Sequence, residues 1–209
     1  MHGLFSLCYF GPIAYYQDIL NCSKIRFEAF ESWQKQSYRN RMYIDGPNGA
    51  LMLNIPIVHQ GRKQVYKDVK ISYKDNWVNK HWQALKSSYN TSPFFEVLAP
   101  DIFKVMQEKP DFLFDLNLKL NQLIWQWLEL KIEREISSEW NAKPEFISDF
   151  RNIHHPKVPL LKNIEEYPQV FKHKAPFKSN LSILDLIFNE GPATYDYLKN
   201  NGLEKSQVL

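Results

Sequence analysis

The sequence has little glycine and cysteine, and it contains no long apolar run. Only 7 of its 209 residues are glycine, and the GxSxG, Walker and GxGxxG motifs are absent. These absences count against hydrolase, NTPase and dehydrogenase functions. No stretch approaches the roughly 20 apolar residues that cross a bilayer, and the N-terminus lacks the features of a signal peptide. We therefore expect a cytoplasmic protein without a membrane span.

The two cysteines, Cys8 and Cys22, are too few for a disulfide framework or a zinc site. Cys8 lies in an apolar run, which is typical of a small buried side chain; a catalytic thiol is the alternative. The adjacent His154 and His155 could bind a metal, but no third ligand follows at a useful spacing. No metal site is expected, and the sequence identifies no cofactor.

Charge of one sign is also lacking, because 26 Lys and Arg residues are interleaved with 23 Asp and Glu residues. The net charge of +3 falls short of the clustered positive charge that nucleic-acid binding requires. Aromatic residues, in contrast, are plentiful at 15% of the chain. A chain of this length can bury one hydrophobic core, so we expect a single domain over residues 1–209.

The periodicity of apolar residues predicts both strands and helices. Apolar runs and alternation predict strands over residues 4–10, 24–30, 42–44, 51–57, 65–73 and 131–140. Helical spacing predicts helices over residues 13–20, 76–89, 94–106 with an interruption at Pro100, 111–129, and 181–198 with a break at Gly191. The first strand, helix and strand should form a parallel crossover, and Asp45-Gly46-Pro47-Asn48-Gly49 should turn a hairpin.

These elements predict an α/β fold, in which several helices pack on a mixed, partly parallel sheet that includes a β-hairpin. Residues 141–180 show little periodicity and hold five of the 12 prolines. We expect a long proline-rich loop there, one that a ligand could order.

The densest polar cluster, here called the polar loop, is Gln34-Lys35-Gln36-Ser37-Tyr38-Arg39-Asn40-Arg41. It lies between a predicted strand and the hairpin. Loops held by rigid elements often carry function. Arg39 and Arg41 flank Asn40 and carry planar guanidinium groups with several N–H donors. Such groups can bind a phosphate, pyrophosphate or carboxylate. The structural alternative is an exposed loop whose arginines pair with surface acids.

A second cluster lies on the predicted helix that begins near residue 76. Trp77, His81 and Tyr89 share one helical face, whereas the Lys80 side chain points about 100° away from that of His81. His81 could act as a general acid–base at neutral pH, or it could be a buried structural histidine among aromatic side chains.

Asp185 interrupts the apolar face of the last predicted helix. It is either a buried partner of an arginine or an active-site carboxylate. Pairing with Arg39 or Arg41 would satisfy both interpretations, because a buried carboxylate requires a compensating charge or hydrogen bonds.

Taken in order, these motifs resemble the WbqC-like protein family over nearly the whole chain. The matching stretches are Tyr9-Phe10-Gly11-Pro12-Ile13-Ala14-Tyr15-Tyr16, residues 30–41, Leu53-Asn54-Ile55-Pro56-Ile57, residues 76–89, Ser92-Pro93-Phe94-Phe95, Tyr167-Pro168-Gln169-Val170-Phe171 and residues 180–192. Leu7-Cys8 stands where members of the family commonly carry Gln-Pro. The resemblance implies a role in bacterial O-antigen or other polysaccharide biosynthesis, with transfer of glycine or a glycine-derived acyl group to an amino sugar.

Together, the residues and the resemblance lead to one hypothesis: amide formation on a nucleotide-linked amino sugar. Its catalytic residues are His81, which would take a proton from the amine, Lys80, which would stabilise the oxyanion, and Asp185. Arg39 and Arg41 would bind the diphosphate. The remaining binding residues are the hydroxyl-binding Asn40 and Gln36, the stacking Tyr15, Trp77 and Tyr89, and Tyr38 in the polar loop.

The alternative is a non-catalytic binding or scaffold protein of a polysaccharide pathway. It predicts that Arg39, Arg41, His81 and Asp185 lie far apart, and that an apolar aromatic patch is exposed. Nucleic-acid binding ranks third, because aromatic residues are plentiful but basic residues are not clustered.

Overall fold

Two β-sheets and several helices make up the part of the chain that the computed structural model describes, residues 1–59, 61 and 63–201. The strands are β1 (His2–Ser6), β2 (Lys24–Glu28), β3 (Arg41–Ile44), β4 (Leu51–Asn54), β5 (Glu133–Ile136) and β6 (Ser148–Asp149). The helices are α1 (Ile13–Leu20), α2 (Trp77–Tyr89), α3 (Phe95–Gln107), α4 (Leu113–Trp127), α5 (Ile183–Glu190) and α6 (Thr194–Asn201), with short 3-10 turns η1 (Tyr66–Asp68) and η2 (Gly191–Ala193). The expected α/β fold is confirmed.

The larger sheet is parallel throughout, with the strand order β5-β2-β1-β6. Its centre is the predicted strand–helix–strand unit, in which Phe5 of β1 lies opposite Phe27 of β2 and both side chains are buried. Strand β1 is shorter than its apolar run, because the run continues into a buried loop that leads to Pro12. Pro12 precedes α1, where its missing N–H leaves no donor unpaired.

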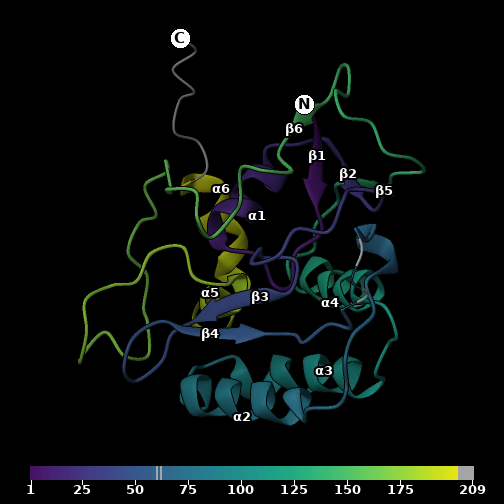
Figure 1. Cartoon of the computed structure of the whole chain (residues 1–209). Helices are drawn as coiled ribbons and strands as arrows, with labels where there is room; N and C mark the ends of the chain where they lie inside the picture. The colour runs from purple at the N-terminus through teal and green to yellow at the C-terminus, as the bar shows by residue number, and fades with distance from the viewer. Residues whose placement is uncertain (60, 62, 202–209) are drawn as a thin grey trace.

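Strands β3 and β4 form the predicted hairpin as a separate antiparallel sheet. Parallel and antiparallel pairing is therefore divided between two sheets and is not mixed in one. The turn closes with a hydrogen bond from the Gly49 N–H to the Gly46 carbonyl, and Gly49 has a φ of 121°, a conformation that favours glycine. In Figure 1 the hairpin lies between the parallel sheet and helices α2 and α3.

The strand predicted over residues 65–73 is wrong. The structure has η1 there, followed by isolated bridges such as Ile57 to Ile71 and Lys70 to Phe112. The alternation of apolar residues arises because Val69 and Ile71 are buried while Lys70 is exposed. An extended segment that pairs one residue at a time with different partners produces the same pattern as a regular strand.

The helices predicted from periodicity are present, and Pro100 does not interrupt α3. Pro100 removes the N–H that would bond to the Glu96 carbonyl, and both residues are on the exposed side of the helix, where water can replace the lost donor. Within the described residues, no helix is both long enough and apolar enough to span a membrane. Ser182 caps α5 as predicted, by accepting a hydrogen bond from the Leu184 N–H.

The proline-rich region is mostly loop, as predicted, apart from the short strand β6. This strand adds to the free side of β1, and the hydrogen bond from the Phe150 N–H to the Leu4 carbonyl continues the pairing. In Figure 1 the green segment of the chain that contains residues 141–180 runs along the outside of the fold. The Arg151 carbonyl lies 3.2 Å from the hydroxyl of Ser6, the last residue of β1, so the loop passes the carboxyl end of the parallel sheet.

Candidate functional site

The carboxyl edge of the parallel sheet is the first place where a ligand site is expected. In open α/β sheets, ligands bind beyond the carboxyl ends of the strands, at the point where the chain turns to opposite sides of the sheet. Here that point lies between β1 and β6, because the chain leaves β1 through α1 to β2 on one side and returns as β6 on the other. The loops that follow β1 and β6 therefore flank the expected site.

A buried ion pair between Arg39 and Glu31 lies next to the end of β1 at this edge. The Arg39 Nε and Nη2 atoms donate to the two carboxylate oxygens of Glu31 at 2.7 and 2.5 Å, and Nη2 also contacts the Ser6 hydroxyl at 2.7 Å. Both charged side chains are only 3% exposed. Because its donors are engaged here, Arg39 holds the loop in place and is not free to bind a diphosphate.

A second ion pair joins the ends of three strands. Arg151, just beyond β6, contacts Glu28 at the end of β2 and Asp149 at the end of β6. The Ser137 hydroxyl, just beyond β5, donates to Glu28 at 2.7 Å. Sequence reasoning missed these residues and Glu31; the only signal was a polar residue at or after the end of each strand. The edge is therefore cross-linked by charge-assisted hydrogen bonds.

A cavity of about 260 Å³, here called the α1 cavity, opens at the expected point beside α1. It is lined by Pro12, Ala14, Asp18, Tyr38, Phe150, Ile153, His154, His155, Val158, Pro159, Leu160, Leu161, Lys162 and Asn180. Most of this wall is apolar and comes from the proline-rich loop. The polar groups gather around the two histidines.

His154 and Asp18 form a hydrogen-bonded pair in the α1 cavity. The His154 Nε2 atom lies 2.9 Å from the Asp18 carboxylate, and Lys162 contacts the other oxygen of that carboxylate. Burial alone would raise the pKa of Asp18, but the hydrogen bonds from His154 and Lys162 lower it overall. Asp18 is therefore a carboxylate at neutral pH.

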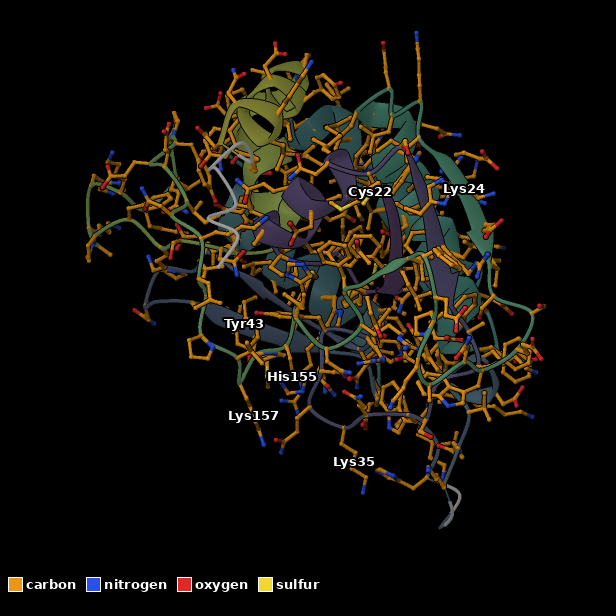
Figure 2. The ribbon with its side chains drawn as sticks, turned by 90° about the horizontal axis from the view of Figure 1, so that it is seen from above. Cys22, Lys24, Lys35, Tyr43, His155 and Lys157 are labelled. Carbon is orange, nitrogen blue, oxygen red and sulfur yellow. The ribbon has the colours of Figure 1, made fainter. Side chains whose placement is uncertain are left out.

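His155 lies between the α1 cavity and the cations of the polar loop. Burial lowers its pKa, and the nearby charges of Arg39, Lys157 and Arg41 lower it further, so His155 is neutral at pH 7. Its Nδ1 accepts a hydrogen bond from the Lys157 N–H at 3.1 Å, which places the ring proton on Nε2. Figure 2 shows His155 and Lys157 on the same side of the molecule as Lys35, away from Lys24.

A second cavity, here called the loop cavity, has a volume of about 370 Å³. It is lined by Trp33, Lys35, Gln36, Asn40, Arg41, Asn54, Ile55, Pro56, Ile57 and His59. The structure thus brings together three of the predicted binding residues: Gln36, Asn40 and Arg41. Tyr38, between them in the sequence, lines the α1 cavity, so the polar loop contributes to both.

The predicted residues of α2 are not among those that line the two cavities. His81 is 4% exposed, with its Nδ1 2.9 Å from the Tyr9 hydroxyl and the Trp77 ring edge-on at 5.1 Å. Burial lowers its pKa to about 4, so the ring is neutral. Lys80 is exposed, whereas His81 is enclosed, and neither residue lines the α1 cavity or the loop cavity.

Asp185 is fully buried, and its expected pairing with Arg39 or Arg41 is wrong. Its carboxylate accepts hydrogen bonds from the hydroxyls of Tyr89 at 2.7 Å and Tyr167 at 2.5 Å. The Gln169 side chain adds a third, and burial raises the pKa of Asp185 to about 6. Uncharged donors compensate the carboxylate here, because Arg39 is already paired with Glu31.

Tyr15 and the two cysteines are also core residues. The Tyr15 hydroxyl donates to the Ser6 carbonyl, and its ring is 1% exposed. Cys8 and Cys22 are buried free thiols, and burial raises the pKa of Cys8 to about 12 and that of Cys22 to about 11. The expectation of a small buried side chain at Cys8 is confirmed, and neither thiol has the lowered pKa of a nucleophile.

Comparison with known proteins gives a family and one distant relative. The model of the WbqC-like protein family matches residues 8–155, which span the polar loop, the hairpin and both histidines of the α1 cavity. An uncharacterised protein of Mycobacterium tuberculosis is 23% identical, over 91% of each chain. No solved structure matches the chain. By the extent of the family match, the chain belongs to the WbqC-like protein family.

Proposed function

We propose that this protein transfers an acyl group to the amino group of a nucleotide-linked amino sugar in surface polysaccharide biosynthesis. The observation that carries the proposal is a pair of cavities of different chemistry on either side of the polar loop. The loop cavity holds Arg41 and side-chain amides, and the α1 cavity holds two histidines and an apolar wall. One cavity suits an anionic sugar nucleotide, and the other suits a reacting acyl group.

The loop cavity supplies the groups that a sugar diphosphate requires. Arg41 is half-buried and keeps its planar guanidinium near Asn54, to which Nε donates at 3.4 Å. Guanidinium groups bind phosphate oxygens through paired donors. Asn40 is fixed by hydrogen bonds to Asn54 and to the Ile55 carbonyl, and Gln36 is exposed at the rim. These amides would bind the sugar hydroxyls.

The α1 cavity supplies a hydrogen-bond donor for the acyl carbonyl. Neutral His155 carries its proton on Nε2, so it can donate to an oxyanion as the amine attacks. In this proposal the proton-transfer role foreseen for His81 belongs to the histidines of the α1 cavity. His81 lines neither cavity, and a ring with a pKa of about 4 is a weak base.

Titration calorimetry with a panel of amino-sugar nucleotides tests the proposal. We expect one of them to bind, and we expect Arg41→Ala to weaken its binding about ten- to a hundredfold, because hydrogen bonds to a charged group contribute about 1.5–3 kcal/mol. Lys80→Ala is the matched control, since it removes a cation that lines neither cavity, and it should leave affinity unchanged. Equal binding by Arg41→Ala and the wild type would contradict the proposal.

One observation favours the second candidate, a non-catalytic binding protein. The buried residues that were expected to form one active site are instead bonded to different neighbours: Arg39 pairs with Glu31, His81 with Tyr9, and Asp185 with Tyr89 and Tyr167. Mass spectrometry distinguishes the two candidates. An acylated amino-sugar nucleotide, formed from the bound nucleotide and an activated acyl donor, would support the transferase; tight binding without product would support the binding protein.

A further inference from the structure

His154 and His155 are adjacent in the sequence and both line the α1 cavity, but they use opposite ring nitrogens in their hydrogen bonds. A carboxylate only accepts hydrogen bonds, so the Nε2 of His154 must carry the proton that it shares with Asp18. In the uncharged form of the ring, the lone pair is then on Nδ1. Among residues 1–59, 61 and 63–201, no hydrogen bond to this atom is found. His155 has the reverse arrangement: its Nδ1 accepts a hydrogen bond, and its Nε2 carries the proton.

We infer that His154, oriented by Asp18, is the base of the acyl transfer, and that the α1 cavity accepts an acyl group with an aliphatic chain. This inference rests on the proposed function and deepens it. A histidine held by a carboxylate through one ring nitrogen, with the other nitrogen facing the reacting groups, is the arrangement that general-base catalysis requires. His154 would be the catalytic residue, and Asp18 would be a positioning residue.

The surroundings of His154 suit this role. Asp18 is a carboxylate whose charge would stabilise the imidazolium that forms, while Lys162 holds the same carboxylate from its other side. The Tyr15 ring meets the His154 ring edge-on at 5.5 Å and fixes its plane. The pair thus combines a buried anion with a ring that reaches a cavity.

The apolar wall indicates the class of acyl group. Val158, Leu160 and Leu161 are exposed for 44%, 38% and 93% of their surface, and they line the cavity together with Phe150 and Ile153. A glycyl group would leave these side chains in contact with water. A short aliphatic chain would cover them, and each buried methylene should tighten binding about fourfold.

The reaction balances with an activated acyl donor, such as a thioester. The neutral amine attacks the carbonyl carbon, an N–C bond forms, and the carbonyl electron pair moves to the oxygen, which faces the His155 Nε2–H. His154 Nδ1 takes the proton from the nitrogen. The electron pair on the oxygen then re-forms the C=O bond as the carbon–sulfur bond breaks, the thiolate leaves with the electron pair of the broken bond, and His154 returns the proton to it. The products are an amide and a free thiol.

Modification of histidine by diethyl pyrocarbonate, followed residue by residue with mass spectrometry, tests the base without a substrate. We expect His154 to react, because it lines the α1 cavity through which the reagent can reach it, and His81 not to react, because it is buried and lines neither cavity. In Asp18→Asn the midpoint of the rate–pH profile of His154 should move to lower pH, since a neutral amide stabilises the imidazolium less than a carboxylate does. Asp18→Glu should restore it.

Asp115→Asn is the matched control, because Asp115 is an exposed carboxylate on α4, and it should leave the profile of His154 unchanged. The titratable groups that face His154 are Asp18, Lys162, Tyr15 and His155, so Lys162→Gln should move the midpoint in the opposite direction to Asp18→Asn. An unreactive His154, or one whose profile is the same in Asp18→Asn, would overturn the inference.

Acyl thioesters of N-acetylcysteamine test the second half of the inference. We expect protection of His154 against modification to increase about fourfold per methylene from the acetyl to the butyryl thioester, and the glycyl thioester to protect least. Equal protection by glycyl and butyryl thioesters would overturn the aliphatic assignment. If His154 reacts as predicted but no amino-sugar nucleotide binds, the proposed acceptor is wrong, whereas the pairing of His154 with Asp18 and the acyl site are retained. If a nucleotide binds but His154 does not react as predicted, only the assignment of His154 as the base is rejected.

Discussion

His81 and His154 differ in what surrounds them, and the difference distinguishes a buried histidine that supports the fold from the histidine proposed as the base. His81 lies on α2 in an aromatic core, bonded to the Tyr9 hydroxyl, and burial lowers its pKa to about 4. His154 lies in a loop, bonded to the Asp18 carboxylate, and it lines a cavity. Aromatic neighbours at helical spacing enclose His81, whereas His154 belongs to a loop segment without periodicity and lines the α1 cavity.

If the buried polar groups support the fold and the cavity groups do not, substitutions in the two regions should differ in their effect on stability. The largest loss is expected from Glu31→Ala, because it leaves the buried Arg39 guanidinium without its counter-charge. Such a change costs about 3–5 kcal/mol of unfolding free energy, which corresponds to a melting temperature lower by roughly 6–20 °C.

Glu108→Ala serves as the control for this prediction, because it breaks an ion pair with Lys119 in which both side chains are nearly half exposed. It should change stability by less than about 1 kcal/mol. Thermal unfolding of both variants checks the difference, and losses of equal size would contradict a supporting role for the Arg39–Glu31 pair.

A somewhat smaller effect is expected from the pH dependence that Asp185 causes. Its pKa of about 6 in the folded protein lies above its ordinary value of 3.8, so the carboxyl group stabilises the fold at low pH, and this contribution is lost as pH rises through 6. Between pH 4.5 and 7 the loss is about 2 kcal/mol. Asp185→Asn should remove it, as urea denaturation at the two pH values would show.

His81 should act in the opposite direction over the same range. Its folded pKa of about 4 lies below the ordinary 6.5, so its contribution is complete above pH 6.5 and is lost as pH falls toward 4. The loss between pH 7 and 4.5 is also about 2 kcal/mol. His81→Gln should therefore be less sensitive to acid than the wild type. An unchanged acid sensitivity in urea denaturation would show that His81 is not enclosed in the folded protein.

The smallest effect on stability is expected in the loop cavity. Arg41→Ala removes a half-buried side chain whose hydrogen bond to Asn54 is long, at 3.4 Å, so the unfolding free energy should change by no more than about 0.5 kcal/mol. The same variant should lose nucleotide affinity. If Arg41→Ala destabilised the protein as much as Glu31→Ala, Arg41 would be a residue that supports the fold. The difference between the buried polar groups and the cavity residues would then not hold.

Local patterns predicted the elements well and the polar contacts poorly. The apolar spacing of α2 and α4 and the turn at Gly49 are set by neighbours in the sequence, so the helices and the hairpin were predictable. The alternation around Val69 was misleading, because bridges to several partners bury alternate residues just as a strand does.

The candidate site depended on contacts between distant residues. Asp18 and His154 are separated by 136 positions, and they meet only because β6 brings the proline-rich loop against α1. Asp185 took hydroxyl partners from α2 and from the loop, although an arginine was the expected partner. The loop cavity was more predictable, since Gln36, Asn40 and Arg41, which line it, lie in one short stretch of the sequence.

The most direct test of the account is a crystal structure of the protein with an amino-sugar nucleotide bound. The account predicts diphosphate oxygens within hydrogen-bonding distance of the Arg41 guanidinium and the sugar amine beside the His154 Nδ1 atom. A ligand bound against His81 and Trp77, with both cavities free of it, would contradict the assignment of function to the carboxyl edge of the sheet.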